Sequence, residues 1–437
     1  MTSFETITGK HAPRVAIIGS GISGLACAYE LHERAQVTVY EANDYIGGHT
    51  ATKDVDIDGR HYAIDTGFIV FNDWTYPNFI RLMDKIGVAS KATEMSFSVS
   101  CDMTGLEYGG ADLNSLFAQR RNLFNPRHWG MLRDILRFNR QVLTELQAGD
   151  IESTQLLGDY LQEHGYGQAF INKYLIPMGS AIWSASTTTM LNFPLLFFAR
   201  FFANHGLLSV NHRPQWRVIE GGSRAYIEPL TKSFKDRIKC STPVTRVIRT
   251  DSGVIVESSA GQDVYDDVVF ACHSDQALNT LVDPTLDERE VLGNIPYQNN
   301  QVILHTDERL LPSRKLAWSS WNYRIKRQQQ DRAVLTYNMN ILQGIEAPET
   351  FCVTLNDTEN IDPEKILGSY EYSHPVFTPE SVKAAESWDD INGSKRTWFC
   401  GAYWANGFHE DGCRSGLRVA QALLARHGLS QPQEELV

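Results

Sequence analysis

Three glycines and one carboxylate near the start of the chain have the spacing of a dinucleotide site. Gly19, Gly21 and Gly24 form G-x-G-x-x-G. Gly19 would make a sharp turn, Gly21 would let the backbone approach a pyrophosphate, and Gly24 would allow close packing of helix on strand. Glu41 follows at about the 20-residue interval at which a carboxylate accepts hydrogen bonds from ribose hydroxyls. The pattern predicts an adenine dinucleotide and leaves NAD and FAD both open.

The glycines lie in a predicted turn between a strand and a helix, and Glu41 lies at the end of the next predicted strand. Residues 15–18 and 36–41 are short apolar runs typical of buried strands, and Leu25, Ala28 and Leu31 recur between them at helical spacing. A helix that begins at the glycine turn offers free N–H groups and a positive dipole end to phosphates. A plain glycine-rich turn is the alternative, which the two strands, the helix and Glu41 together disfavour. The contacts expected at this turn are Gly19, Ser20, Gly21, Ile22, Ser23 and Gly24.

A second glycine motif follows directly. Glu41-Ala42 is followed by Gly47-Gly48 and then by D-T-G at 65–67. This arrangement resembles the flavoprotein superfamily of amine oxidases, phytoene desaturases and protoporphyrinogen oxidase, and within it a bacterial branch of FAD/NAD-binding oxidoreductases. The resemblance implies non-covalently bound FAD, with contacts from Glu41, Ala42, Gly47, Gly48, His49, Thr50, Thr66, Gly67 and Phe68.

Two residues depart from the pattern of that superfamily. Tyr45 stands where a basic residue usually precedes the glycine pair, and His49 stands where an arginine usually follows it. Both positions normally help to hold the pyrophosphate or the flavin edge, so we expect those contacts to differ here.

Two later segments agree with the resemblance. Residues 240–275 alternate apolar and polar residues in strands, and the resemblance implies that the Val244 backbone lies against the adenine; a simple β-meander is the alternative. Residues 396–404 predict a strand and turn, and 414–428 predict a helix whose N-terminus would point at the flavin. That end would stabilise negative charge on reduced flavin. The contacts implied here are Gly401, Gly407, Phe408, His409, Gly412 and Ser415.

The fold class that follows is α/β, with a Rossmann-like FAD-binding domain and a substrate domain made of a mixed sheet and helices. The FAD-binding domain is expected to be discontinuous, in three segments: 12–72, 206–285 and 396–437. The substrate domain would comprise 73–205, mostly helical and forming a roof, and 286–395, with strands. Only one G-x-G-x-x-G is present, so we expect no separate nicotinamide domain.

Aromatic residues in three segments are candidates to line a substrate cavity, although any one of them could be an ordinary core residue. These candidates are Trp183, Trp321, Tyr323, Tyr403 and Phe408. Amine oxidases of the resembled fold hold the amine between two aromatic residues, usually tyrosines, and Phe408 aligns with one of those tyrosines. Because Phe408 has no hydroxyl, the resemblance favours an apolar C–H donor over an amine.

The favoured function is therefore hydride removal by FAD from an apolar donor. The bacterial branch that the chain resembles implies, most specifically, the dehydrogenation of a methylated fatty-acyl lipid. An amine or amino-acid oxidase of the same fold is the first alternative, and a non-catalytic lipid carrier is the second. Oxygen, a quinone or a carrier protein would accept the electrons. The sequence identifies no catalytic base: His49, His409 and Glu410 could lie near the flavin or merely contact the cofactor or its neighbours.

Composition limits the classes of partner and the cellular location that we expect. A net charge of −12 argues against a nucleic-acid partner. Residues 1–13 lack a signal-peptide pattern and no apolar run reaches about 18 residues, so we expect a cytoplasmic protein. The apolar run 191–210 could touch the inner membrane or be part of an ordinary core. If it touches the membrane, polar substitutions of Phe198 and Phe202 should release the protein from lipid vesicles. Seven scattered cysteines predict reduced thiols, and no ligand pattern predicts a metal.

Overall fold

The computed structural model describes residues 12–209, 211–327, 332–429 and 436. Most of the polar N-terminal stretch, the last residue of the 191–210 run and residues 430–435 and 437 lie outside the described residues.

A five-stranded parallel sheet forms the centre of one half of the molecule. Its strand order is β10-β2-β1-β14-β20. The strands come from distant parts of the chain: β1 (Arg14–Ile18), β2 (Gln36–Tyr40), β10 (Ile238–Lys239), β14 (Asp267–Phe270) and β20 (Thr397–Phe399). All four pairings are parallel. Strands of this kind are buried on both faces and therefore read as short apolar runs. The α/β fold class is confirmed.

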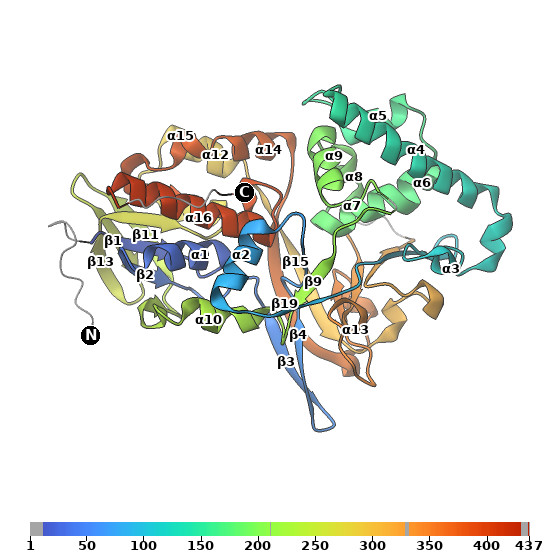
Figure 1. Ribbon diagram of the computed structural model, residues 1–437, viewed down its shortest axis with the longest axis horizontal. Coiled ribbons are helices and arrows are strands. Elements are labelled where there is room, and N and C mark those ends of the chain that lie inside the picture. The colour runs from blue at the N-terminus through green and yellow to red at the C-terminus, as the bar shows by residue number, and fades with distance from the viewer. Residues whose placement is uncertain (1–11, 210, 328–331, 430–435, 437) are drawn as a thin grey trace.

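The side chains of β1 point alternately into two cores. Val15 and Ile17 pack with α1 (Ile22–Leu31) and α16 (His409–Arg426). Ala16 and Ile18 pack toward an antiparallel meander, which confirms the strands expected in 240–275. The meander is β11 (Val244–Arg249), β12 (Val254–Ser258) and β13 (Gly261–Tyr265). Figure 1 shows these layers on its left side.

Further helices and a hairpin surround this half. The helices are α2 (Pro77–Ile86), α10 (Ile227–Thr231), α11 (Ser274–Thr280), α12 (Leu286–Gly293), α14 (Pro379–Glu386) and α15 (Trp388–Ile391). The hairpin β3 (Thr52–Ile57) and β4 (Arg60–Asp65) projects downward in Figure 1. It turns at Asp58-Gly59, where both residues have positive φ. A small antiparallel sheet joins β5 (Phe71–Asn72), β9 (Trp216–Ile219) and β6 (Ser90–Ala92).

A seven-stranded mixed sheet and a layer of helices make the other half. The strand order is β19-β15-β18-β17-β16-β7-β8. The strands are β7 (Phe97–Cys101), β8 (Leu106–Gly109), β15 (Tyr297–His305), β16 (Trp321–Ile325), β17 (Leu335–Asn338), β18 (Cys352–Leu355) and β19 (Ile366–Pro375). The helices are α3 (Leu113–Leu116), α4 (Pro126–Ala148), α5 (Leu157–Glu163), α6 (Gln168–Phe170), the π-helix η2 (Ile171–Leu175), α7 (Ile176–Trp183), α8 (Thr187–Leu191), α9 (Leu195–Asn204) and α13 (Met339–Leu342).

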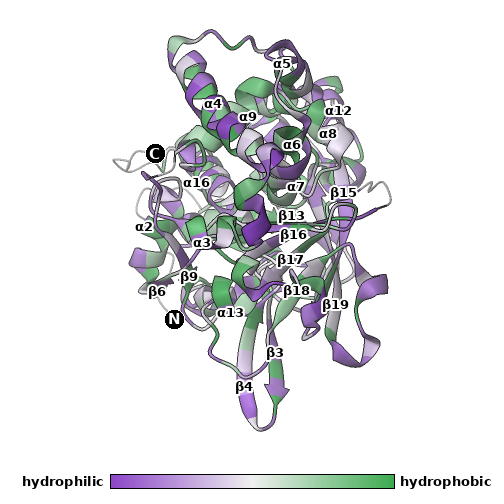
Figure 2. Cartoon of the chain, turned by 90° about the vertical axis from the view of Figure 1, so that its right-hand side faces the viewer, coloured by the Kyte–Doolittle hydropathy of each residue, from purple (hydrophilic) through white to green (hydrophobic). Residues whose placement is uncertain are grey.

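Most of 73–205 is helical, as expected, and Figure 2 shows these helices above the sheet. The exceptions are the short strand β6 and the pair β7 and β8. β7 is held by a parallel pairing with β16, more than 200 residues away in the chain, so local periodicity could not reveal it.

The apolar run 191–210 mostly forms α9, which lies inside the helical layer. Phe198 and Phe202 are fully buried and stack on each other at 4.0 Å between ring centroids. The hypothesis that these two side chains touch a membrane is therefore wrong; they are core residues. Among the described residues, no helix combines the length and apolarity needed to cross a bilayer. All seven cysteines are free thiols, as expected.

Candidate cofactor site

The first glycine turn connects β1 to α1 and depends on the absence of side chains. Gly19 has φ +110°, and its N–H donates to the Tyr40 carbonyl at 2.8 Å. A Cβ on Gly19 would lie 2.6 Å from the Ala271 carbonyl oxygen, and one on Gly24 would lie 2.1 Å from the Gly19 oxygen. The sharp turn and the close helix packing expected from the motif are thus both present.

Gly21 is different, because it faces open space. A Cβ there would meet no atom within 4 Å. The second glycine loop approaches from one side: Gly48 lies so near that its Cβ would be 3.2 Å from the Gly21 Cα, and Gly47 donates to the Ser20 hydroxyl at 3.2 Å. Within the described chain no side chain caps the first turn of α1. Bare backbone at a helix N-terminus suits a pyrophosphate.

Glu41 is buried beside this turn. Its carboxylate accepts hydrogen bonds from the backbone N–H and the hydroxyl of Ser20, at 3.0 and 2.6 Å, and from Asn43 N–H at 2.8 Å. The Glu41 carbonyl accepts from Thr242 N–H at 2.8 Å, which brings the start of β11, at Val244, into the same region. Ala42 is exposed next to Glu41.

His49 follows the second glycine loop, and its ring lies 5.5 Å from the ring of Tyr372 and 5.7 Å from that of His374. Its carbonyl accepts from Phe68 N–H at 2.7 Å, and a Cβ on Gly67 would lie 2.2 Å from that oxygen. Burial, together with His374 and His273, lowers the pKa of His49 to about 3. The imidazole is neutral at pH 7 and carries no charge to replace the usual arginine.

The Nε2 atom of His49 is buried without a hydrogen-bond partner in the described part of the chain. A buried polar atom of this kind costs free energy unless a further group satisfies it. A bound flavin edge is such a group, so His49 fits the cofactor that the resemblance implies, although through one hydrogen bond and not through an ion pair.

A chain of hydrogen bonds leads from the second glycine loop to α16. The Thr50 hydroxyl lies 2.5 Å from the Tyr226 hydroxyl, which lies 2.8 Å from His409 Nε2. The His409 ring stacks on Phe68 with centroids 3.7 Å apart. Burial and the proximity of His49 lower the pKa of His409 to about 3. His409 is therefore held as a neutral side chain by the Tyr226 hydroxyl and the Phe68 ring.

Sequence reasoning missed three polar partners in this region. Tyr226 follows the Gly221-Gly222 turn, and Tyr372, on β19, bonds to the Thr66 hydroxyl at 2.8 Å. Asp65 accepts from Ser223 N–H and from the Thr52 hydroxyl, and burial raises its pKa to about 6. Asp65 belongs to the D-T-G motif, which was the one available signal. The tyrosines are joined to the site only by folding.

Glu410 has a structural role. Its carboxylate accepts from the backbone N–H groups of Asn78 and Phe79 at the beginning of α2, at 3.1 and 2.8 Å. Burial raises the pKa of Glu410 to about 7. Of the three acid–base candidates, His49 alone has a buried side-chain atom with no hydrogen-bond partner among the described residues.

The third cofactor segment brings α16 against α1. A Cβ on Gly412 would lie 2.8 Å from the Ile22 side chain. The Ser415 hydroxyl accepts from Gly401 N–H at 2.9 Å, and Gly407 has φ +88°. The helix expected over 414–428 begins earlier, at His409, because Asp411 accepts from Phe408 N–H at 3.0 Å and caps it. The first turns of both helices therefore lie side by side.

Three aromatic residues link this helix end to the helical layer. The Phe408 ring lies 5.1 Å from Phe201, which lies 4.8 Å from Trp183. Tyr323, on β16, is buried against Ala181 of α7. Trp321 meets the Tyr337 ring edge-on at 5.1 Å.

Tyr403 is not brought together with the other cavity candidates. It is buried in the core beneath the meander, and a Cβ on Gly401 would lie 2.2 Å from its ring. Tyr403 belongs to the one-turn helix η10 (Ala402–Trp404) and packs in that core. Within the described residues there is no cluster of three or more metal-ligating side chains.

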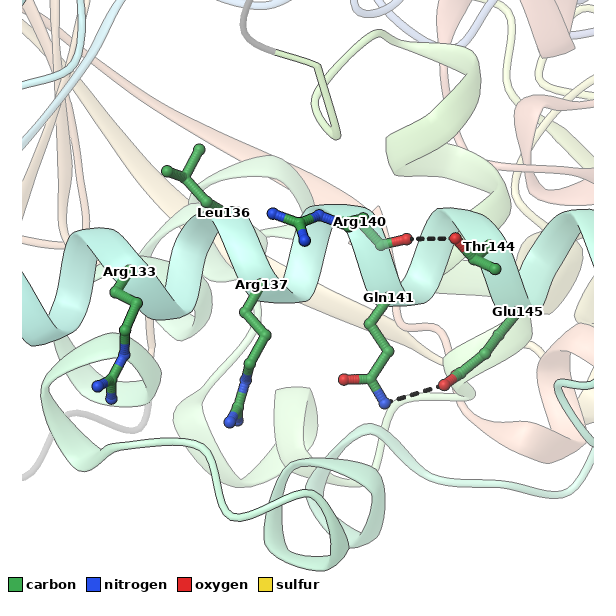
Figure 3. Close-up of a pocket in the computed structure, with 7 residues that line it drawn as sticks. All are labelled: Arg133, Leu136, Arg137, Arg140, Gln141, Thr144 and Glu145. Atoms are coloured by element: carbon green, nitrogen blue, oxygen red, sulfur yellow. Dashed lines mark hydrogen bonds between the residues drawn. The ribbon is translucent and has the colours of Figure 1, made fainter.

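A hollow of about 500 Å³ lies elsewhere, on the outer surface of α4. Figure 3 shows the side chains that line it, from Arg133 to Glu145, all projecting from this one helix. None of these residues belongs to the glycine loops, so this hollow is distinct from the cofactor site.

Comparisons with known proteins agree with this geometry. Over 75 residues the chain is 37% identical to a probable zeta-carotene desaturase from Synechococcus elongatus, a match that covers 17% of this chain and only 15% of that protein. Among solved structures, a CLA-producing fatty acid isomerase from P. acnes superposes with a TM-score of 0.68 at 18% identity, covering 95% of this chain and 98% of that one. Cyclohexylamine oxidase from Brevibacterium oxydans superposes with a TM-score of 0.66 at 16% identity, and the match covers 96% of this chain and 100% of that one. At these identities the structures show a shared fold.

The family assignment rests on a longer match. The model of the flavin-containing amine oxidoreductase family matches residues 22–344, which is well over half of the chain. The matched region begins at Ile22, the first residue of α1, and includes the second glycine loop, the meander and much of the seven-stranded sheet. The chain therefore belongs to the flavin-containing amine oxidoreductase family and is a flavin-dependent oxidoreductase.

Proposed function

We propose that the flavin is FAD, bound non-covalently along the three segments. The open space at Gly21, the bare N-terminus of α1 and the buried carboxylate of Glu41 support a dinucleotide rather than a mononucleotide. The unpartnered Nε2 atom of His49 supports a flavin edge on the other side of Gly48. The residues named for the cofactor in the sequence are the ones we assign to it.

When bound, a flavin accepts a hydride from the substrate and so supplies the redox step. The chain's own contribution is to bind and orient. The N-terminus of α16, which Asp411 caps, would present its dipole toward the bound ring and would favour negative charge there. His49 stays neutral and offers one hydrogen bond, so it does not add positive charge beside the cofactor.

We further propose that the substrate is an apolar chain, most specifically a fatty-acyl lipid that is dehydrogenated. This substrate proposal rests mainly on the position of Phe408, which is the N-cap residue of α16 and stacks on Phe201. A hydroxyl-free wall next to a series of aromatic rings favours an apolar donor. The zeta-carotene desaturase and the fatty acid isomerase are both named for long apolar substrates, which gives secondary support.

An amine or amino-acid oxidase is the second candidate, favoured by the family and by the fold of cyclohexylamine oxidase. The test is anaerobic mixing of the purified protein with fatty-acyl lipids and with a panel of amines, following flavin absorbance. Bleaching by an acyl lipid supports the proposal, and bleaching by an amine alone overturns it. Reoxidation by oxygen, a quinone or a carrier protein then identifies the electron acceptor. A colourless protein that cannot be reconstituted with FAD contradicts both candidates and favours a lipid carrier.

A further inference from the structure

Large apolar side chains are exposed together at one edge of the molecule. Phe124, just before α4, is 88% exposed, and Leu113, at the start of α3, is 75% exposed. Trp129, in the first turns of α4, is 50% exposed. Figure 1 places α3 and α4 at the end of the long axis opposite β1 and α1. Exposed apolar patches of this kind mark interaction surfaces.

Hydrogen bonds hold this edge in one conformation. The Trp129 indole N–H donates to the Leu123 carbonyl at 2.9 Å, and the Trp129 ring packs 5.3 Å from Phe117. These contacts tie α4 to the one-turn helix η1 (Arg120–Phe124) and to the end of α3. The apolar residues are therefore presented by a preformed structure.

A distant part of the chain extends the same edge. Gly109 lies between α3 and the one-turn helix η6 (Lys315–Ala317). A Cβ on Gly109 would lie 3.1 Å from the Ser115 Cβ and 3.3 Å from the Ala317 carbonyl oxygen, so the two elements are neighbours. Leu316, which is half exposed, thus joins the patch. Folding, and not sequence proximity alone, gathers these residues.

Cations surround the apolar residues. Residues 113–140 contain six arginines and one carboxylate, in a chain whose net charge is −12. That carboxylate, Asp134, is buried, accepts from Gly167 N–H at 3.0 Å and pairs with the exposed Arg133 guanidinium at 3.5 Å. The exposed cations are Arg120, Arg121, Arg127, Arg133 and Arg140, together with Arg314 and Lys315 beside Leu316.

The neighbouring carboxylates already have partners. Asp112 accepts from Ser115 N–H at 2.6 Å and caps α3, and Glu107 accepts from the Ser313 hydroxyl at 2.8 Å. Along α4, Arg133 and Arg140 line the hollow drawn in Figure 3, with Leu136 between them in sequence. Hydrophilic and hydrophobic segments therefore interleave around α3 and α4, as Figure 2 shows from this side.

We propose that this edge docks on the surface of an anionic lipid bilayer. The docking face comprises Leu113, Phe124, Trp129 and Leu316, ringed by Arg120, Arg121, Arg127 and Arg133. The apolar side chains enter the interface while the guanidinium groups stay at the lipid phosphates. A second copy of the chain is the less suitable occupant, because it would bring like charges together. The inference stands on exposure and charge and does not depend on the reaction proposed above.

The test is flotation of the purified full chain with vesicles of phosphatidylcholine alone and with vesicles that also contain phosphatidylglycerol. We expect binding to the anionic vesicles, weakened by high salt. Phe124→Ser should reduce that binding about tenfold, because one large apolar side chain no longer enters the interface. Arg127→Glu should reduce binding about fivefold or more, and only on anionic vesicles.

Matched controls separate docking from folding and from catalysis. Leu286→Ser removes an apolar side chain that is 83% exposed on α12, and Arg60→Glu reverses an exposed charge on the β3–β4 hairpin; both should bind as the wild type does. Gly21→Ala, expected to lack flavin, should also still bind. Wild-type protein that floats with neither vesicle, or control variants that lose as much binding as Phe124→Ser, would overturn the proposal. So would concentration-dependent self-association that Phe124→Ser abolishes.

Discussion

Gly416 of α16 and Ser23 of α1 face each other at backbone distance: a Cβ on Gly416 would lie 2.1 Å from the Ser23 carbonyl oxygen. Nearly 400 residues separate them in the chain. The contact aligns the first turns of two helices whose N-termini would both face the proposed FAD, one at the proposed pyrophosphate turn and one beside the proposed flavin ring. Glycines at the two ends of the sequence thus belong to one packing arrangement.

Gly416→Ala should destabilise the fold by about 2 kcal/mol or more, because the added methyl group meets backbone atoms that cannot move without shifting α1. Thermal unfolding measures the effect, and flavin content should fall with it. Gly130→Ala is the matched control, since Gly130 is also within a helix and its Cβ would meet nothing within 4 Å. That variant should be unchanged or slightly more stable.

Gly21→Ala should separate cofactor binding from folding. The φ and ψ of Gly21, −67° and 176°, are open to alanine, and the new Cβ points into empty space. We expect a wild-type unfolding temperature for the flavin-free chain, with flavin content lowered about tenfold or more. Gly24→Ala should lower both the unfolding temperature and the flavin content, since its Cβ would lie 2.1 Å from the Gly19 oxygen. A Gly21→Ala protein that purifies with full flavin absorbance would show that nothing occupies that space.

Local patterns predicted the parts of the site that are formed by neighbouring residues. The turn at Gly19 to Gly24 depends on one strand, one turn and one helix, so its spacing was sufficient. Residues whose roles arise from tertiary contacts were not predictable. Tyr226 enters the site only because Thr50 and His409, from two other segments, meet at its hydroxyl. The hypothesis of a membrane-contacting surface at Phe198 and Phe202 rests on their apolar character alone. A run of apolar residues does not reveal whether other helices cover it, and here they do.

Phe408→Tyr should slow flavin reduction by an acyl lipid about tenfold if the proposed substrate is correct. The new hydroxyl would make polar the wall beside Phe201 that is proposed to contact the acyl chain, so that chain would bind and orient less well. Phe408→Leu keeps the wall apolar and should retain most of the rate. Stopped-flow absorbance measures both, and an unchanged thermal unfolding temperature excludes a folding defect. Faster reduction of the tyrosine variant by amines would favour the oxidase alternative instead.

His409 and Glu410 are adjacent, yet their titrations should act on stability in opposite directions. The pKa of His409 is lowered to about 3, so between that pH and about 6.5 the unfolded chain binds a proton that the folded chain does not. Stability therefore rises with pH through this window. The pKa of Glu410 is raised to about 7, so above about 4.5 the unfolded chain has lost a proton that the folded chain keeps. Stability falls with pH through that window, until the folded group also ionises.

Between about pH 5 and 6 the two slopes overlap, each worth about 1.4 kcal/mol per pH unit at most, and they largely cancel. His409→Gln removes the rising slope, so stability of that variant should fall with pH relative to the wild type. Glu410→Gln removes the falling slope, so its stability should rise with pH instead. Urea unfolding at several pH values measures both slopes. Because the two variants must diverge in opposite directions, a common shift in both would indicate general damage to the cap of α16 and would contradict the assigned protonation states.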